Sequence, residues 1–98
     1  MIFINLDIEM SKKIYVLDDN ITLTSLMDYV LRSEGFNVKC CTCSEQAIGE
    51  IQVFQPDLIL LDWLMPNVSG KDILDIIQSD PLLKRTPVFL LSLSLIHI

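Results

Sequence analysis

Three aspartates stand directly after short apolar runs, and their type and spacing could support chemistry. Asp18 and Asp19 follow the run at residues 14–17, and Asp62 follows the run at residues 58–61. Three carboxylates brought close together repel one another, so keeping them ionised requires a cation. A hard divalent ion such as Mg²⁺ prefers carboxylate oxygens, keeps positions open for phosphate oxygens and assists phosphoryl transfer. An aspartate in this setting could itself be the nucleophile, whereas the plainer interpretation is three solvated turn acids.

The elements that must position these acids are predicted from an alternation of short apolar runs and amphipathic stretches. Apolar runs without polar alternation are typical of strands covered on both faces, and apolar residues at i, i+3, i+4 and i+7 indicate helices. The pattern predicts strands at residues 14–17, 36–41, 58–61 and 88–91, and helices at residues 23–31, 44–54 and 71–78. This order predicts an α/β fold, a doubly wound parallel sheet, in which ligands bind at the carboxyl ends of the strands.

Each predicted helix has an apolar face, and two of them carry end signals. Gly35 stands where a left-handed C-terminal residue of the first helix is expected. Thr42 or Ser44 could cap the second helix, with Glu45 in its first turn. The apolar face of the first helix is formed by Leu23, Leu26, Met27, Val30 and Leu31. The inward faces of the second and third helices are formed by Ala47, Ile48 and Ile51, and by Ile73, Leu74 and Ile77.

The composition is that of one small globular domain. The 98 residues are 51% hydrophobic and 20% charged, which excludes a disordered chain. Thirteen acids against seven bases give a formal net charge of −6, which argues against a nucleic-acid-binding surface. No apolar run approaches the roughly 18–20 residues that span a bilayer. Residues 1–10 lack the basic start of a secretory signal, so we expect a cytoplasmic protein without membrane contact.

The three cysteines predict neither a disulfide framework nor a zinc site. Cys40, Cys41 and Cys43 crowd into one short segment, and an odd number there cannot form a set of disulfides. A zinc site would need further ligands, and the sole histidine, His97, lies at the far end of the chain. We expect free thiols that pack as small hydrophobic groups.

Four segments of the chain share an order and spacing that is specific as a set. They are residues 13–20 (KIYVLDDN), 56–66 (PDLILLDWLMP), 69–70 (SG) and 86–92 (TPVFLLS). Together they resemble the receiver domain of bacterial two-component response regulators, over residues 12–92. The resemblance implies a flavodoxin-like receiver fold with strand order 2-1-3-4, in which the family's fifth strand and last two helices are missing.

The resemblance also implies roles for individual residues. Asp62 would be the phosphoacceptor, which takes a phosphoryl group from a sensor histidine kinase or a phosphotransfer protein. Asp18, Asp19, Asp62 and the backbone carbonyl of Leu64 would hold Mg²⁺, and the Ser92 hydroxyl would be the switch group that turns toward the phosphoryl group. Such a domain is a signalling phosphoacceptor that assists its own phosphoryl transfer, and not an enzyme.

The ends of the chain depart from the family pattern. Residues 1–11 are expected to be an N-terminal extension, with Met10 as an alternative start, and residues 12–92 to be an incomplete receiver domain. Residues 93–98 match the in-frame translation of a transposon-derived sequencing adapter, so we expect a non-native tail. No residue can take the role of the family's lysine at the end of the fifth strand, so we expect the fragment to be inactive as it stands. The complete protein could form a homodimer.

Two other functions fit the acids less well. A haloacid-dehalogenase-type aspartyl phosphatase needs a second aspartate two positions after the nucleophile, and Leu64 occupies that position. A receiver-like module that is never phosphorylated and acts by protein contact would have no use for the three acids. A nucleotide-binding α/β domain is disfavoured, because no glycine-rich loop follows the first strand.

Overall fold

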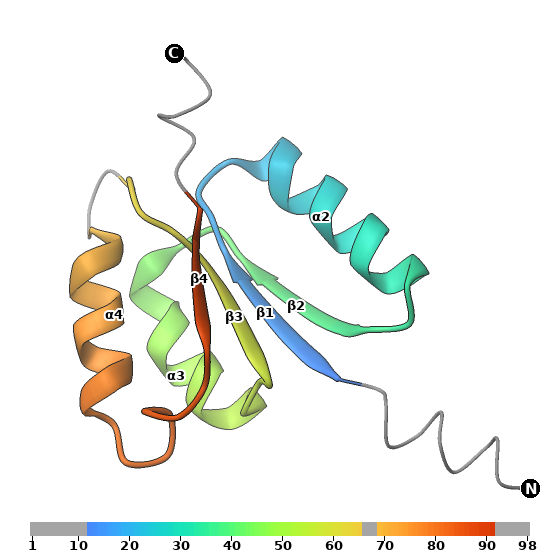
Figure 1. The fold of residues 1–98 in the computed structure, drawn as a ribbon. Helices are drawn as coiled ribbons and strands as arrows, with labels where there is room; N and C mark the ends of the chain where they lie inside the picture. The colour runs from blue at the N-terminus through green and yellow to red at the C-terminus, as the bar shows by residue number, and fades with distance from the viewer. Residues whose placement is uncertain (1–11, 66–68, 92–98) are drawn as a thin grey trace, which may run out of the picture.

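The computed structural model describes residues 12–65 and 69–91, which form a parallel sheet between two helical layers (Figure 1). The elements along the chain are β1 (Lys13–Leu17), α2 (Ile21–Ser33), β2 (Asn37–Cys41), α3 (Ser44–Phe54), β3 (Leu58–Asp62), α4 (Gly70–Ser79) and β4 (Val88–Leu91). The strand order is β2-β1-β3-β4, and all pairings are parallel. Helix α2 covers one face of the sheet, and α3 and α4 cover the other. The predicted doubly wound sheet is confirmed.

The strand register brings the ends of β1 and β3 level with each other. Leu17 lies opposite Leu61 of β3 and opposite Cys41 of β2. The first residue after β1 and the last residue of β3 therefore lie at the same rim of the sheet. The sheet thus places Asp18 and Asp62 next to one another, as the alternation of strands and helices predicts.

Two apolar cores hold the helices on the sheet. The larger core lies under α3 and α4 and the smaller one under α2. The buried members of the larger core are Tyr15, Leu17, Cys41, Ala47, Ile51, Ile59, Leu61, Ile73, Ile77 and Leu83. Those of the smaller core are Ile14, Val16, Val38 and Leu60. Residues of β1 and β3 contribute to both cores, which explains why their sequences are apolar without alternation.

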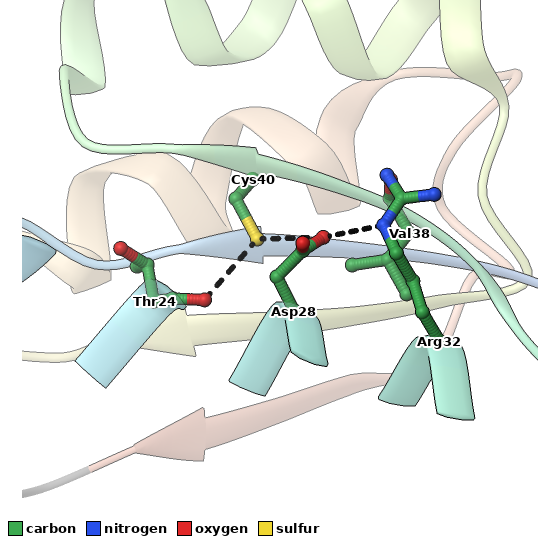
Figure 2. Close-up of polar contacts among 5 residues, drawn as sticks. All are labelled: Thr24, Asp28, Arg32, Val38 and Cys40. Atoms are coloured by element: carbon green, nitrogen blue, oxygen red, sulfur yellow. Dashed lines mark hydrogen bonds and ion pairs between the residues drawn. The ribbon is translucent and has the colours of Figure 1, made fainter. Parts of the chain in front are cut away.

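Helix α2 leans toward β2, and this corrects part of its predicted apolar face. Thr24 is buried, and the Cys40 thiol of β2 donates to its carbonyl oxygen at 3.7 Å (Figure 2). On the opposite flank of α2, Leu26 and Val30 are 57% and 46% exposed, so this part of the predicted apolar face is not buried against the sheet. The reason is the neighbourhood: among the described residues, α2 is the only helix on this face, so nothing covers that flank.

The first helix begins and ends with standard caps. The Asn20 side chain accepts a hydrogen bond from the N–H of Leu23 at 2.9 Å, which satisfies a free donor of the first turn. At the other end, Gly35 has φ +97° and its N–H donates to the carbonyl of Arg32 at 3.0 Å. The next N–H, of Phe36, donates to Leu31 at 3.1 Å, which completes a Schellman motif. The predicted role of Gly35 is confirmed.

The start of α3 differs from the prediction. Cys43 is the N-cap, and its side chain makes no capping hydrogen bond, so neither Thr42 nor Ser44 has that role. The cysteines are free thiols, as expected. Cys41 is buried, whereas Cys40 and Cys43 are partly exposed. Within the two described ranges, no helix has the length and apolar character needed to cross a bilayer.

The two outer strands of the described sheet differ in how their unpaired sides are treated. In β2, Asn37 and Cys41 use their backbone groups to bond the β1 side, so the Val38 carbonyl between them points outward. The guanidinium of Arg32, which is also paired with Asp28 at 2.8 Å, donates to that carbonyl (Figure 2). In β4, Phe89 and Leu90 are 62% and 47% exposed, and no described strand pairs with its outer side.

Candidate functional site

Three carboxylates meet at the carboxyl ends of β1 and β3. Asp18 and Asp19 follow β1 directly, and Asp62 is the last residue of β3. Each offers one carboxylate oxygen, and these oxygens all lie within 4.8 Å of one another. Asp18 and Asp62 are buried, at 0% and 3% exposure, whereas Asp19 is exposed. The cluster therefore consists of two carboxylates shielded from solvent and one that is exposed to it.

The two oxygens of Asp18 have different environments. Oδ1 accepts a hydrogen bond from the N–H of Asn20 at 2.9 Å, which fixes the orientation of the carboxylate. Oδ2 is buried and has no hydrogen-bond partner among the described residues. A buried carboxylate oxygen without a partner is costly, and a cation at the cluster would satisfy it. The donor set, three carboxylates, fits a hard divalent ion.

Asp62 is held in the same way by the loop that follows it. Its Oδ1 accepts a hydrogen bond from the N–H of Leu64 at 3.2 Å. Between them, Trp63 donates its N–H to the Leu91 carbonyl of β4 at 2.9 Å and accepts from Gly70 at 3.1 Å. The segment that follows Asp62 is thus tied to β4 of the sheet on one side and to the start of α4 on the other.

The electrostatics of the cluster disfavour three free anions. Burial raises the pKa of the Asp62 carboxyl to about 6; the Leu64 N–H opposes this rise, and the charges of Asp18 and Asp19 add to it. Burial also raises the pKa of Asp18, against the effect of the Asn20 N–H and together with the charge of Asp19. A bound cation would favour the ionised forms of both residues.

The structure places most, but not all, of the predicted site residues. It brings Asp18, Asp19 and Asp62 together. Leu64 lies beside them with its side chain exposed and its N–H on Asp62, and the role of its carbonyl as a metal ligand stays a prediction. Ser92, the predicted switch residue, lies outside the described residues.

Two residues that the sequence reasoning did not single out for the cluster contribute to it. Asn20 caps α2 with its side chain and holds Asp18 with its N–H. The signal that could have found it is an asparagine directly before a helical pattern. Gly70 is not among the described residues with positive φ. It contributes by permitting a close approach to the backbone of Asp62 and Trp63.

Comparison with known proteins agrees with this geometry. The family model described as "Response regulator receiver domain" matches residues 14–95. The chain belongs to the response regulator receiver family. Among solved structures, this receiver chain is similar to the N-terminal domain of a response regulator receiver protein from Methanoculleus marisnigri JR1, with a TM-score of 0.77 and 26% identity over 81% of this chain and 64% of that one. It is also similar to the phosphorylated cyanobacterial phytochrome response regulator RcpA, with a TM-score of 0.73 and 33% identity over 83% of this chain and 64% of that one.

The curated relatives are longer proteins. The receiver chain is 35% identical over 83 residues to the phosphate regulon transcriptional regulatory protein PhoB of Rhizobium meliloti, which covers 85% of this chain and 37% of that protein. It is 34% identical over 71 residues to the DNA-binding response regulator MtrA of Mycobacterium tuberculosis, covering 72% of this chain and 31% of that protein. The chain therefore spans about a third of the length of these relatives.

Proposed function

We propose that this receiver domain accepts a phosphoryl group on Asp62 from a phosphohistidine of a sensor histidine kinase or a phosphotransfer protein. Asp18, Asp19, Asp62 and the backbone carbonyl of Leu64 hold Mg²⁺ for this transfer. The observation that carries the proposal is the convergence of three carboxylate oxygens within 4.8 Å of one another. One of the three residues, Asp18, also has a buried oxygen, Oδ2, without a hydrogen-bond partner among the described residues. Membership of the receiver family supports it.

The nucleophile of the proposed transfer is a member of the cluster. One oxygen of the Asp62 carboxylate attacks the phosphorus, the bond from phosphorus to the donor nitrogen breaks, and the imidazole keeps the electron pair and takes a proton from solvent. When bound, Mg²⁺ offsets the negative charge of the phosphoryl oxygens. The Leu64 N–H holds Oδ1 of Asp62 and so orients the carboxylate. The Ser92 hydroxyl turns toward the phosphoryl group afterwards.

The alternatives lack supporting geometry. A haloacid-dehalogenase-type phosphatase would need an acid at position 64, where an exposed leucine stands. A module that is never phosphorylated would bury Asp18 and Asp62 with raised pKa values and no compensation, because burying an uncompensated carboxylate lowers stability. The buried acids are better explained as ligands and acceptor.

A phosphoryl-donor assay tests the proposal. The chain, and a version completed through the family's fifth strand, are incubated with acetyl phosphate and Mg²⁺, and intact-protein mass spectrometry measures the added phosphoryl group. We expect label on the completed version that EDTA prevents and Asp62→Asn abolishes. Asp75→Asn, which changes an exposed acid on α4, should label normally. Label that survives Asp62→Asn would show that another residue is the nucleophile.

We further propose how this domain fits into a whole protein. Residues 12–92 form an incomplete receiver domain, with residues 1–11 as an extension and residues 93–98 as a non-native tail. The curated relatives are named as transcriptional or DNA-binding regulators, so the receiver would belong to a longer cytoplasmic regulator in which another part contacts DNA. The acidic charge of −6 supports a receiver that does not itself bind nucleic acid.

A further inference from the structure

Gly70, the first residue of α4, has no room for a side chain. A Cβ atom built there would lie 2.6 Å from the carbonyl oxygen of Asp62 and 2.7 Å from the Cα of Trp63. Both atoms belong to the backbone, so no side-chain rotation can relieve the contact. Gly35, the described glycine with positive φ, has the opposite profile, because nothing lies within 4 Å of the position that its Cβ would take. Glycine is required at position 70 by space and not by φ.

The segment that Gly70 touches also orients the acceptor carboxylate. The Gly70 N–H donates to the Trp63 carbonyl at 3.1 Å, and the next residue, Leu64, donates its N–H to Oδ1 of Asp62. A displacement of the Trp63 backbone must therefore move the group that fixes Asp62. On the far side, the bond from Trp63 to Leu91 restricts where the segment could go.

We propose that Gly70 is a positioning residue for the metal cluster. By lying against the backbone of Asp62 and Trp63, the start of α4 sets the direction of the Asp62 carboxylate and of the Leu64 backbone relative to Asp18. This inference rests on the proposed function, because its test measures the binding of a divalent ion to the cluster. Linkage requires that the ion, in return, strengthens the contact between α4 and this loop.

A pair of glycine substitutions separates positioning from helix propensity. Gly70→Ala adds the clashing Cβ, and Gly49→Ala adds a Cβ inside α3, where nothing lies within 4 Å. Alanine favours helix over glycine at both positions, so a loss in Gly70→Ala alone cannot come from propensity. The readout is a Mg²⁺ titration followed by the fluorescence of Trp63, the only tryptophan. We expect about tenfold weaker binding in Gly70→Ala, as for other residues that orient metal ligands, and unchanged binding in Gly49→Ala.

A stability control excludes a general effect of destabilisation. Ile77 is buried on α4, two turns beyond Gly70, and its side chain belongs to the larger apolar core. Ile77→Val should lower the denaturation midpoint, as loss of a buried methylene does, and leave the Mg²⁺ affinity unchanged. Equal losses of affinity in Ile77→Val and Gly70→Ala, or an unchanged affinity in Gly70→Ala, would overturn the inference.

Hydrogen exchange in the unsubstituted chain tests the same coupling without a variant that could fail to fold. Saturating Mg²⁺ should slow exchange of the Gly70 amide severalfold and leave the Gly49 amide unchanged. No slowing at Gly70 despite binding would contradict the positioning role. Failure of the unsubstituted chain to bind Mg²⁺ at all would instead contradict the proposed function, so the two failures can be told apart.

Discussion

Asp18 and Asp62 share one local arrangement. In each, the backbone N–H two residues later donates to Oδ1, at 2.9 Å from Asn20 and at 3.2 Å from Leu64. This bond fixes the carboxylate while leaving Oδ2 available, so a ligand meets an oxygen that is already oriented. Burial raises the pKa of both carboxyls, which means that the cluster disfavours the ionised forms of its own acids unless a cation offsets their charge.

Because the pKa of Asp62 is raised, we predict that removing the charge of its carboxylate increases the stability of the fold in a pH-dependent way. Between about pH 4 and pH 6 the native state binds more protons than the unfolded state, so stability falls as pH rises through this window, and the loss is complete above pH 6. Without divalent ions, Asp62→Asn should therefore be more stable than the parent above pH 6, with the difference fading toward pH 4. Urea denaturation at several pH values measures this, and a difference that is constant with pH would contradict it.

Mg²⁺ should reverse that ranking. An ion that binds the native state stabilises it in proportion to the logarithm of its concentration over Kd. The parent chain should gain stability with added Mg²⁺ at pH 7, and Asp62→Asn should gain much less. Because binding needs ionised carboxylates, the Mg²⁺ affinity of the parent should weaken as the pH is lowered through about 6. Calorimetric titration at pH 5 and pH 7.5 would show the difference, and equal affinities would contradict it.

The exposed member of the cluster gives a cleaner test of metal binding. Asp19→Asn removes one ligand charge at a solvent-facing position, so Mg²⁺ affinity should fall by about tenfold or more while stability changes by less than about 0.5 kcal/mol. Trp63 fluorescence measures the first and urea denaturation the second. Asp75→Asn is the matched control, with affinity unchanged. A large loss of stability in Asp19→Asn would mean that Asp19 serves the fold.

The site could be predicted from the sequence as far as it depends on strand ends. An acid directly after a fully apolar strand has only one rim of the sheet to occupy, so the meeting of Asp18, Asp19 and Asp62 was predictable. The Leu64 N–H contact and the tight fit at Gly70 were not, because they depend on the path of a loop backbone. Ser92 and the carbonyl of Leu64 remain predictions.

At the level of elements, the sequence predicted correctly those helix bounds that depend on a few neighbouring residues. The bounds of α3 match residues 44–54 as predicted, and the glycine stop of α2 is a property of a few residues. The orientation of α2 depends instead on its neighbours. Thr24 and Asp28 contact β2 through Cys40, and the helix leans with them, which leaves Leu26 and Val30 exposed. An apolar periodicity cannot reveal which part of a wide apolar face is covered.

Two glycine substitutions test this interpretation of the helices through stability. Gly35→Ala forces a left-handed conformation on a residue with a Cβ, although the space around it is free, so it should lower the free energy of unfolding by about 1 kcal/mol. Gly49→Ala, in the middle of α3, should raise it by about 0.5–1 kcal/mol. Urea denaturation measures both. Changes of the same sign would show that backbone conformation does not separate the two positions.

At the scale of the whole molecule, the side of the sheet near β4 lacks cover in the described part. Phe89 and Leu90 point to opposite faces and are both largely exposed, and the outer backbone groups of β4 have no described strand beside them. Unpaired apolar edges favour association between chains. Each apolar side chain left uncovered forgoes about 1.5–3 kcal/mol of the free energy that its burial would contribute.

The exposed edge of β4 predicts that the 98-residue chain, on its own, associates and unfolds with low cooperativity. We expect it to associate as its concentration rises and to melt less cooperatively than a version completed through the fifth strand. Phe89→Lys should reduce association, since a charge on an edge strand opposes pairing. Sedimentation velocity over a range of concentrations, with a thermal melt, measures both. A monomeric chain with a sharp two-state melt would contradict this prediction.

The hydrogen bond from Arg32 to the Val38 carbonyl blocks the outer edge of β2, so it affects where a further strand could pair with the sheet. A further strand that paired with β2 would have to displace the Arg32 guanidinium, which Asp28 also holds, and the charge-assisted hydrogen bond to the Val38 carbonyl would be lost. Among the described residues, no side chain bonds the outer backbone groups of β4 in this way. We therefore expect any further strand, from this chain or from another, to pair with β4, the outer strand beside β3.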